Sequence, residues 1–176
     1  MFLPRVIPVL LLSNNGLVKT KQFEKSTYIG DPINAVRIFN EKEVDEIVFL
    51  DIQASKKNIS PNYEMIEKIA SECFMPLAYG GGITKLDQID KILKIGVEKI
   101  VINSSAISNL DIIEKIANNI GSQSVVISVD IKKTFFGNYS IYLHKENRTS
   151  KTNLIDYLKK VEELGAGEIF INSVNE

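Results

Sequence analysis

Apolar residues occur along this chain in short unbroken runs, and three of these runs follow one pattern. In each, a charged residue precedes three or four apolar positions and then polar groups, at residues 44–51, 97–104 and 166–173. The agreement is strongest between IGVEKIVINS and LGAGEIFINS. Apolar runs without alternation are typical of strands that are buried on both faces, as in parallel sheets. The pattern therefore predicts a repeated strand of a parallel sheet.

The intervening segments predict helices, because their apolar residues recur every three to four positions. We expect helices at residues 33–39, 63–73, 86–95, 110–118 and 154–164, and strands at 6–12, 47–51, 77–79, 100–102, 125–130 and 169–171. A hairpin is expected at 136–143, bent at residues 137–138. Alternating strands and helices predict an α/β fold with a parallel sheet and right-handed crossovers. No linker-like stretch interrupts residues 1–176, so a single domain is expected.

Four short motifs predict where the helices begin. Asp31 supplies a capping acceptor before Pro32, which suits a first helical turn, and Ser60 precedes another proline in the same way. Residues 84–87 and 108–111 resemble capping boxes in which Asp takes the place of Glu.

Composition narrows the range of functions. The chain is 44% hydrophobic and 24% charged with a formal net charge of −1, so there is no electrostatic reason to expect nucleic acid or an anionic membrane as partner. Its single cysteine, Cys73, excludes an intrachain disulfide, lies in an apolar run where a buried structural thiol is expected, and suits a reducing compartment. The first apolar run is too short to span a bilayer, and no signal-peptide pattern precedes it. We therefore expect a cytoplasmic location.

Two neighbouring loops could hold an anion. Glycine fills residues 80–82, after one expected strand and before a helix, where backbone amides can approach a phosphate closely. Asn103 and Ser104 end the next strand, beside that glycine loop in a barrel. Glycines after strands also form ordinary tight turns, but two such adjacent loops favour a phosphate site that includes Gly81, Gly82, Asn103 and Ser104.

Two carboxylates follow apolar strands. Asp51 and Asp130 each end such a run, where a side chain faces the mouth of a barrel and could act as a general acid or base. For each, the alternative is a helix cap or a turn residue. The only histidine, His144, lies among charged neighbours in the expected hairpin, so we interpret it as a solvated surface residue without a catalytic role. No group of residues has metal-ligand spacing, so no metal or other cofactor is expected.

Charged residues also occupy one register at the start of the strands. Arg5, Glu46, Lys99 and Glu168 would converge on the amino-terminal face of a barrel, opposite the expected active site. The alternation of sign favours ion pairing over random surface charge.

The chain resembles the family of the cyclase subunit (HisF) of imidazole glycerol phosphate synthase over essentially its whole length. The matching stretches are residues 5–8, 30–32, 48–51, 76–83, 102–104, 121–123, 129–130 and 161–169. The resemblance implies a (β/α)8 TIM barrel of the ribulose-phosphate-binding type, of which about six strand–helix units are present. Closing such a barrel takes about 250 residues, so we expect that the chain is C-terminally incomplete.

That resemblance also implies roles for individual residues. A glutaminase (HisH-like) partner would bind the amino-terminal face and release ammonia, which crosses the barrel to a phosphorylated small-molecule substrate. Arg5, Glu46, Lys99 and Glu168 match the charged gate to this passage. Gly82, Asn103 and Ser104 match a phosphate site, and Asp130 matches one of two catalytic aspartates. Asp51 and Lys19 match positions that contact the ligand.

One departure bears on the chemistry. Leu11 stands where the family's other catalytic aspartate belongs, and leucine cannot exchange a proton. A branch of the family associated with amidation of a nucleotide-activated sugar in surface-glycan biosynthesis fits this change. A cyclase of histidine biosynthesis, a non-catalytic ammonia conduit or scaffold, and an inactive fragment remain as alternatives.

Overall fold

The computed structural model describes residues 4–21, 26–57, 59–135, 137–144 and 146–174. Its contacts divide the chain into two compact units, one with residues 1–20 and 26–100 and the other with residues 21–25 and 101–176. The boundary falls within strand β6 (Lys99–Ile102).

The first unit is built on a mixed sheet with the strand order β3-β2-β1-β4-β5. These strands are β1 (Val9–Ser13), β2 (Gly16–Thr20), β3 (Ser26–Gly30), β4 (Ile47–Asp51) and β5 (Leu77–Gly80). β1 pairs with β4 and β4 with β5 in parallel, whereas β2 pairs antiparallel with both β1 and β3. β5 is buried along its whole length, as expected of a central parallel strand.

Helices α1 (Pro32–Glu41), α2 (Ile52–Lys57), α3 (Tyr63–Glu72) and α4 (Leu86–Lys94) complete this unit. The carboxylate of Asp31 accepts a hydrogen bond from the Asn34 amide at 3.0 Å, which confirms the predicted cap of α1. The prediction for Ser60 was wrong, because Asn62 caps α3 instead by accepting from the Met65 amide.

Helix α4 begins differently from the predicted capping box at residues 84–87. The Gln88 carbonyl oxygen reaches back to accept from the backbone amides of Thr84 and Lys85, at 2.8 and 3.0 Å. The longer side chain of Gln88 reaches these donors from within the first turn, so the reaching residue is Gln88 rather than Asp87. In the second unit, Asn109 rather than Ser108 accepts from the Asp111 amide before α6, so the box predicted at 108–111 was also wrong.

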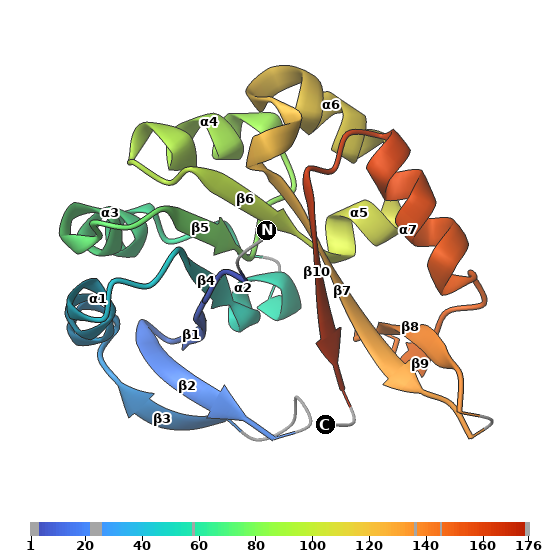
Figure 1. Cartoon of the computed structure of the whole chain (residues 1–176), viewed down its shortest axis with the longest axis horizontal. Coiled ribbons are helices and arrows are strands. Elements are labelled where there is room, and N and C mark those ends of the chain that lie inside the picture. Colours follow the sequence, from blue (N-terminus) through green and yellow to red (C-terminus); the bar gives the residue numbers. More distant parts are fainter. Residues whose placement is uncertain (1–3, 22–25, 58, 136, 145, 175–176) are drawn as a thin grey trace. The chain divides into compact units, whose positions relative to one another are not determined.

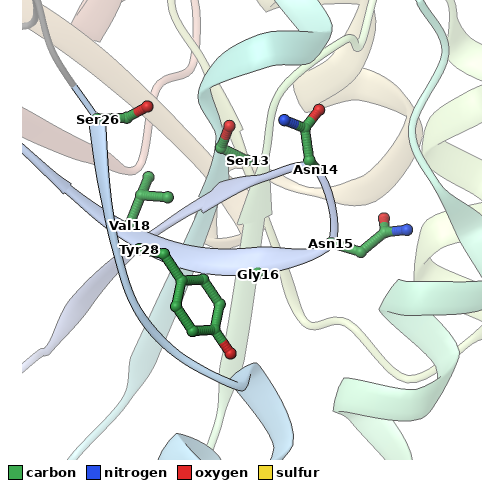
Figure 2. Close-up of a pocket in the computed structure, with 7 residues that line it drawn as sticks. All are labelled: Ser13, Asn14, Asn15, Gly16, Val18, Ser26 and Tyr28. Carbon is green, nitrogen blue, oxygen red and sulfur yellow. The ribbon is translucent and has the colours of Figure 1, made fainter.

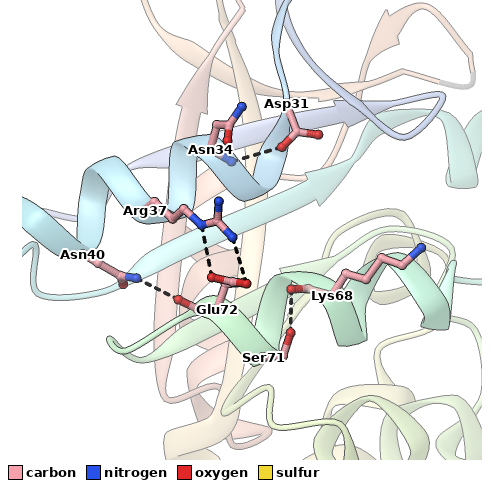
Figure 3. Close-up of polar contacts among 7 residues, drawn as sticks. All are labelled: Asp31, Asn34, Arg37, Asn40, Lys68, Ser71 and Glu72. Atoms are coloured by element: carbon pink, nitrogen blue, oxygen red, sulfur yellow. Dashed lines mark hydrogen bonds and ion pairs between the residues drawn. The ribbon is translucent and has the colours of Figure 1, made fainter.

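Helices α1 and α3 lie side by side along one side of β4 and β5 (Figure 1). A bidentate contact joins them, with the Arg37 guanidinium 3.1 and 3.2 Å from the two carboxylate oxygens of Glu72 (Figure 3). The Asn40 side chain donates to the Glu72 carbonyl at 2.7 Å, so this helix pair is held by polar contacts at its edge as well as by its apolar face.

The second unit contains α5 (Ser104–Ser108), α6 (Asp111–Ile120), a 3-10 turn η1 (Ser122–Ser124), β7 (Val125–Lys133), β8 (Tyr139–Leu143), β9 (Arg148–Thr149), α7 (Leu154–Glu163) and β10 (Glu168–Ser173). β10 pairs with β7 in parallel, and β8 pairs with the far end of β7 antiparallel. Figure 1 shows α6 and α7 on the outer side of β7 and β10.

Isoleucine supplies most of the largest fully buried side chains. In the first unit these are Ile47, Phe49, Ile66, Ile69, Ile89, Ile92 and Ile100, and in the second Ile102, Ile113, Ile116, Ile127 and Ile141. They come from strands and from the inward faces of helices, as the apolar spacing predicts. Each fully buried side chain of this size contributes about 1.5–3 kcal/mol through removal of apolar surface from water.

The predicted hairpin at 136–143 differs from the observed one. Its first arm is the end of β7 itself, which continues from Asp130 to Lys133, and its second arm is β8. Residue Phe136 lies outside the described residues. Apart from this extension, the predicted strands and helices agree with observed elements to within a few residues, whereas β2, β3, β9, α2 and α5 were not predicted.

Candidate functional site

A buried carboxylate forms the centre of the polar cluster in the second unit. Asp130 lies on β7 and only 7% of its side chain is exposed. One carboxylate oxygen accepts a hydrogen bond from the Asn103 amide group at 2.7 Å, and the other accepts from the Asn172 amide group at 3.0 Å. Both donors come from the carboxyl ends of strands, since Asn103 follows β6 and Asn172 pairs in register with Asp130 on β10. This arrangement meets the requirement that a buried charge has hydrogen-bond donors.

Asn172 was missed as a site residue, although a signal for it was present. The repeat places Asn103 and Asn172 at the same position of IVINS and IFINS. Their amide groups bind opposite oxygens of the same carboxylate. The repeat therefore reflects a shared contact as well as a shared strand.

His144 is not the solvated surface residue that we expected. Its Nε2 atom is buried and lies 3.0 Å from a carboxylate oxygen of Asp130, and one quarter of its side chain is exposed. The separation is that of an ion pair between an imidazole nitrogen and a carboxylate. The reason is strand pairing. Ile131 pairs with Ile141, so Asp130 lies opposite Tyr142, and His144, two residues further on, projects from the same face.

Asp51 and the glycine loop occupy the carboxyl ends of β4 and β5 in the first unit. The Asp51 carboxylate accepts from the backbone amides of Gln53 and Ala54, each at 3.0 Å, and so binds the first turn of α2. Gly81 and Gly82 have φ angles of 121° and 70°, in the region that favours glycine. A Cβ atom on Gly81 would lie 2.5 Å from the Asp51 carbonyl oxygen. The glycines are therefore required by backbone packing, whether or not a phosphate binds.

The other predicted ligand residues have ordinary local roles. Ser104 is the first residue of α5, and its carbonyl accepts from the Ser108 hydroxyl at 2.8 Å. Lys19 is exposed on β2, opposite Thr27. Leu11 lies on β1 between Val18 and Leu50, in a partly exposed position without proton-exchanging atoms.

A small cavity of about 340 Å³ lies at the tip of the β1–β2–β3 hairpin (Figure 2). It is lined by Ser13, Asn14, Asn15, Gly16, Val18, Ser26 and Tyr28. The two asparagines form the turn with positive φ angles, as two-residue hairpin turns require. None of the predicted site residues lines this cavity, so it adds no support to the predicted ligand set.

Three of the four predicted gate residues meet in the first unit. One carboxylate oxygen of Glu46 lies 2.6 Å from the Lys99 ammonium and 3.2 Å from the Arg5 guanidinium. The exposed side-chain fractions are 3% for Glu46, 15% for Lys99 and 50% for Arg5. Glu168 is the first residue of β10 in the second unit. In the described part of the first unit, a nearly buried carboxylate thus contacts two cations.

Burial raises the pKa values of several groups, among them Cys73, Tyr79 and Tyr157. Burial raises the pKa of the Cys73 thiol, which is half-buried beside the Met75 carbonyl and therefore carries little thiolate character. Burial also raises the pKa of Tyr79 above its usual range and that of Tyr157 to about 12. These groups favour their neutral forms and belong to the packing of the fold.

Within the described residues, no group of three or more His, Cys, Asp and Glu side chains could bind a metal ion. The helices in these segments are too short or too polar to cross a bilayer.

The strands, helices and polar groups together define an α/β protein with a buried carboxylate and glycine loop at the carboxyl ends of parallel strands, the usual location of sites in such folds. The chain belongs to the histidine biosynthesis protein family, whose family model matches residues 5–176. This membership confirms the predicted fold class, an α/β fold of the TIM-barrel family with about six strand–helix units, and the predicted relation to HisF.

Individual relatives agree with this assignment. The chain is 55% identical over 176 residues to a Leptospira borgpetersenii protein provisionally named imidazole glycerol phosphate synthase subunit HisF, covering 99% of this chain and 69% of that protein. It is 52% identical over 171 residues to a Pseudomonas aeruginosa protein provisionally named subunit hisF2, covering 97% and 68%. Identity to subunit HisF of Streptomyces coelicolor is 35% over 171 residues, with the same coverage. The chain is thus a HisF-like synthase subunit.

Proposed function

We propose that this chain uses ammonia from a glutaminase partner to aminate a phosphorylated small molecule, and that its chemistry has diverged from imidazole formation. The observation that carries the proposal is the difference between two positions. Asp130 is present as a buried carboxylate with two amide donors, whereas Leu11 offers only carbon atoms where the family resemblance expects the second carboxylate. Amidation of a nucleotide-activated sugar, in a cytoplasmic pathway, is the chemistry that we favour.

The loss of one carboxylate bears directly on cyclisation. Acid–base catalysis requires groups that can give and take protons within hydrogen-bond reach of the substrate, and each contributes about 10²–10⁴-fold in rate. A leucine side chain contributes nothing of this kind. Amination by ammonia makes a smaller demand, because ammonia is itself the nucleophile and a single carboxylate can accept the proton that it loses on attack.

The Glu46 cluster supports the delivery of ammonia. Arg5, Glu46 and Lys99 form a contact in which the carboxylate is almost fully buried. Buried ion pairs of this kind contribute little net stability compared with apolar packing, so their presence is consistent with a functional demand. We assign them, with Glu168, to the entrance of an ammonia passage at the face where the glutaminase binds.

The first experiment tests the chemistry. The chain is mixed with ammonium and the bis-phosphorylated ribonucleotide used by the cyclase, and imidazole formation is followed. We expect no imidazole product from the wild type and a gain of product in Leu11→Asp. Imidazole formation by the wild type would contradict the proposed divergence and support a cyclase of histidine biosynthesis, a reading favoured by the 35% identity to the Streptomyces coelicolor subunit.

The second experiment tests the partner. A glutaminase of the HisH type is titrated with the chain, and glutamine hydrolysis is measured with wild type, Glu46→Gln and the matched control Glu64→Gln. Glu64 is a surface carboxylate paired with Lys68 at the same 2.6 Å separation. We expect the wild type and the control to stimulate hydrolysis and Glu46→Gln to impair the coupling of hydrolysis to amination. Absence of binding to the glutaminase would reject the partner assignment, and stimulation without any amination would favour a conduit.

A further inference from the structure

We propose that His144 is the proton-exchange partner of Asp130. The inference rests on the proposed function, in that it assumes that Asp130 acts on substrate. The observation behind this inference is the separation of 3.0 Å between the imidazole Nε2 and the Asp130 carboxylate, which does not depend on the family resemblance. His144 is the single histidine of the sequence, so a signal from a histidine imidazole can be assigned to it without ambiguity.

The other groups at the carboxylate cannot exchange protons with it. Asn103 and Asn172 donate amide hydrogens and thereby hold the two oxygens in place, but an amide neither gains nor loses a proton near neutral pH. Imidazole can do both, because each ring nitrogen can carry or release a proton. His144 therefore differs in kind from the two asparagines, which act as positioning residues.

The Asp130 carboxylate is more buried than the His144 imidazole, as a proton relay from a buried group to a more exposed one requires. The carboxylate of Asp130 is almost inaccessible, with 7% of its side chain exposed, whereas the imidazole of His144 is 25% exposed. Nε2 is buried and faces the carboxylate. The imidazole thus joins a buried carboxylate to a side chain that is one quarter exposed.

Neighbouring charged and aromatic groups define the surroundings of the imidazole. The Tyr142 ring packs edge-on against the imidazole, with ring centroids 4.8 Å apart. The Lys132 ammonium lies 5.4 Å from the centroid of the same Tyr142 ring. In the turn after β8, Glu146 pairs with Arg148. Asp130 on β7 is thus the carboxylate in direct contact with the imidazole, and Lys145 lies outside the described residues.

The proposed step moves one proton at a time. Asp130 takes a proton from the substrate, so that the substrate X–H bond breaks and a carboxyl O–H bond forms. The carboxyl group passes this proton to the Nε2 lone pair of neutral His144, which restores the carboxylate and leaves an imidazolium. The imidazolium then releases its Nδ1 proton to water. The same steps in reverse let His144 supply a proton for a leaving group, so the pair serves in either direction.

The activity test uses a variant that keeps a side-chain amide and loses proton exchange. We expect His144→Gln to lower kcat about 100-fold with KM changed less than threefold. Exogenous imidazole is expected to raise the rate of His144→Ala at least tenfold above its rate without imidazole. Asp130→Asn combined with His144→Gln is expected to be no slower than Asp130→Asn alone. The control Lys132→Gln changes a neighbouring charge without touching Asp130, and is expected to change the rate less than twofold. A rate in His144→Gln above one third of wild type, or multiplicative losses in the double variant, overturns the proposal.

A second measurement does not depend on the reaction. The ¹⁵N signals of the sole imidazole report which ring nitrogen carries the proton, and we expect Asp130→Asn to change that tautomer ratio while Lys132→Gln leaves it unaltered. An unchanged ratio in Asp130→Asn refutes the pair itself. A changed ratio in a protein that aminates none of the substrates tested leaves the pair in place and counts against the proposed function instead.

Discussion

Removal of the Glu46 charge provides the sharpest test of the electrostatics in the first unit. At 2.6 Å, opposite unit charges attract by about 6 kcal/mol with an effective dielectric constant of 20, and the desolvation of both groups offsets part of this. Because Glu46 is almost fully buried and Lys99 mostly so, we expect the coupling between them to be about 3 kcal/mol. Arg5, half exposed at 3.2 Å, should couple to Glu46 by about 0.5 kcal/mol.

The assay is a double-mutant cycle in urea. Free energies of unfolding are measured for wild type, Glu46→Gln, Lys99→Met and the double variant, and the coupling energy is obtained from the four values. The matched control is the cycle of Glu64→Gln with Lys68→Met, whose charged atoms are also 2.6 Å apart but exposed on α3. Its coupling should be at most about 0.5 kcal/mol. A buried pair that couples no more strongly than this exposed pair refutes the reasoning that burial governs the strength of the contact.

Three further predictions concern stability. In the described part of the chain the Tyr157 hydroxyl is buried without a hydrogen-bond partner, so Tyr157→Phe should raise Tm or leave it unchanged. Burial raises the pKa of Tyr157 to about 12 from 10.0, so between pH 10 and 12 only the unfolded tyrosine ionises and wild-type stability should fall. In urea titrations at alkaline pH, Tyr157→Phe should lose about 2–3 kcal/mol less stability than the wild type over this range. Gly82→Ala should cost about 2–4 kcal/mol in chemical denaturation, because φ is 70° and the new Cβ would lie 2.5 Å from the Ile59 carbonyl oxygen; a loss below about 1 kcal/mol would contradict this packing. Arg37 lowers the pKa of Glu72 from 4.5 through a hydrogen bond and through its charge. The small stabilisation by this pair is therefore present above pH 4.5 and disappears as the pH falls through the lowered pKa. Arg37→Met and the wild type should converge in stability in acid, and a constant difference across the titration would exclude the ion pair as its cause.

The accuracy of the sequence predictions varies with how completely an element is buried. Strand β4 was predicted with its observed bounds because four consecutive apolar residues leave no solvent-facing position to blur the pattern. Strand β3, by contrast, is exposed along most of its length, and its residues show no apolar run. Helix α5 has only five residues, four of them Ser or Ala, which is too short for a helical period.

The candidate site shows the same division. Residues at strand ends were found because apolar runs mark the strands in the sequence, and Asp130 and Asn103 prove to be in contact. The position of His144 depends on the register of the β7–β8 hairpin. A bend centred on residues 137–138 would place Asp130 opposite residue 145, whereas the observed pairing places it opposite Tyr142 and brings His144 onto the same face. Local patterns do not contain that register, so the contact could not be predicted from them.

The close approach of Gly81 to Asp51 also has a mechanical consequence. With no side chain between them, the loop after β5 rests directly on the backbone at the end of β4, and the Asp51 carboxylate in turn holds the first turn of α2. Neither loop can shift toward the other without a steric clash. A molecule that displaces the glycine loop outward would therefore remove a backbone contact from the end of β4, at the residue whose carboxylate binds the first turn of α2, so that occupancy at one strand end would change the surroundings of the start of that helix.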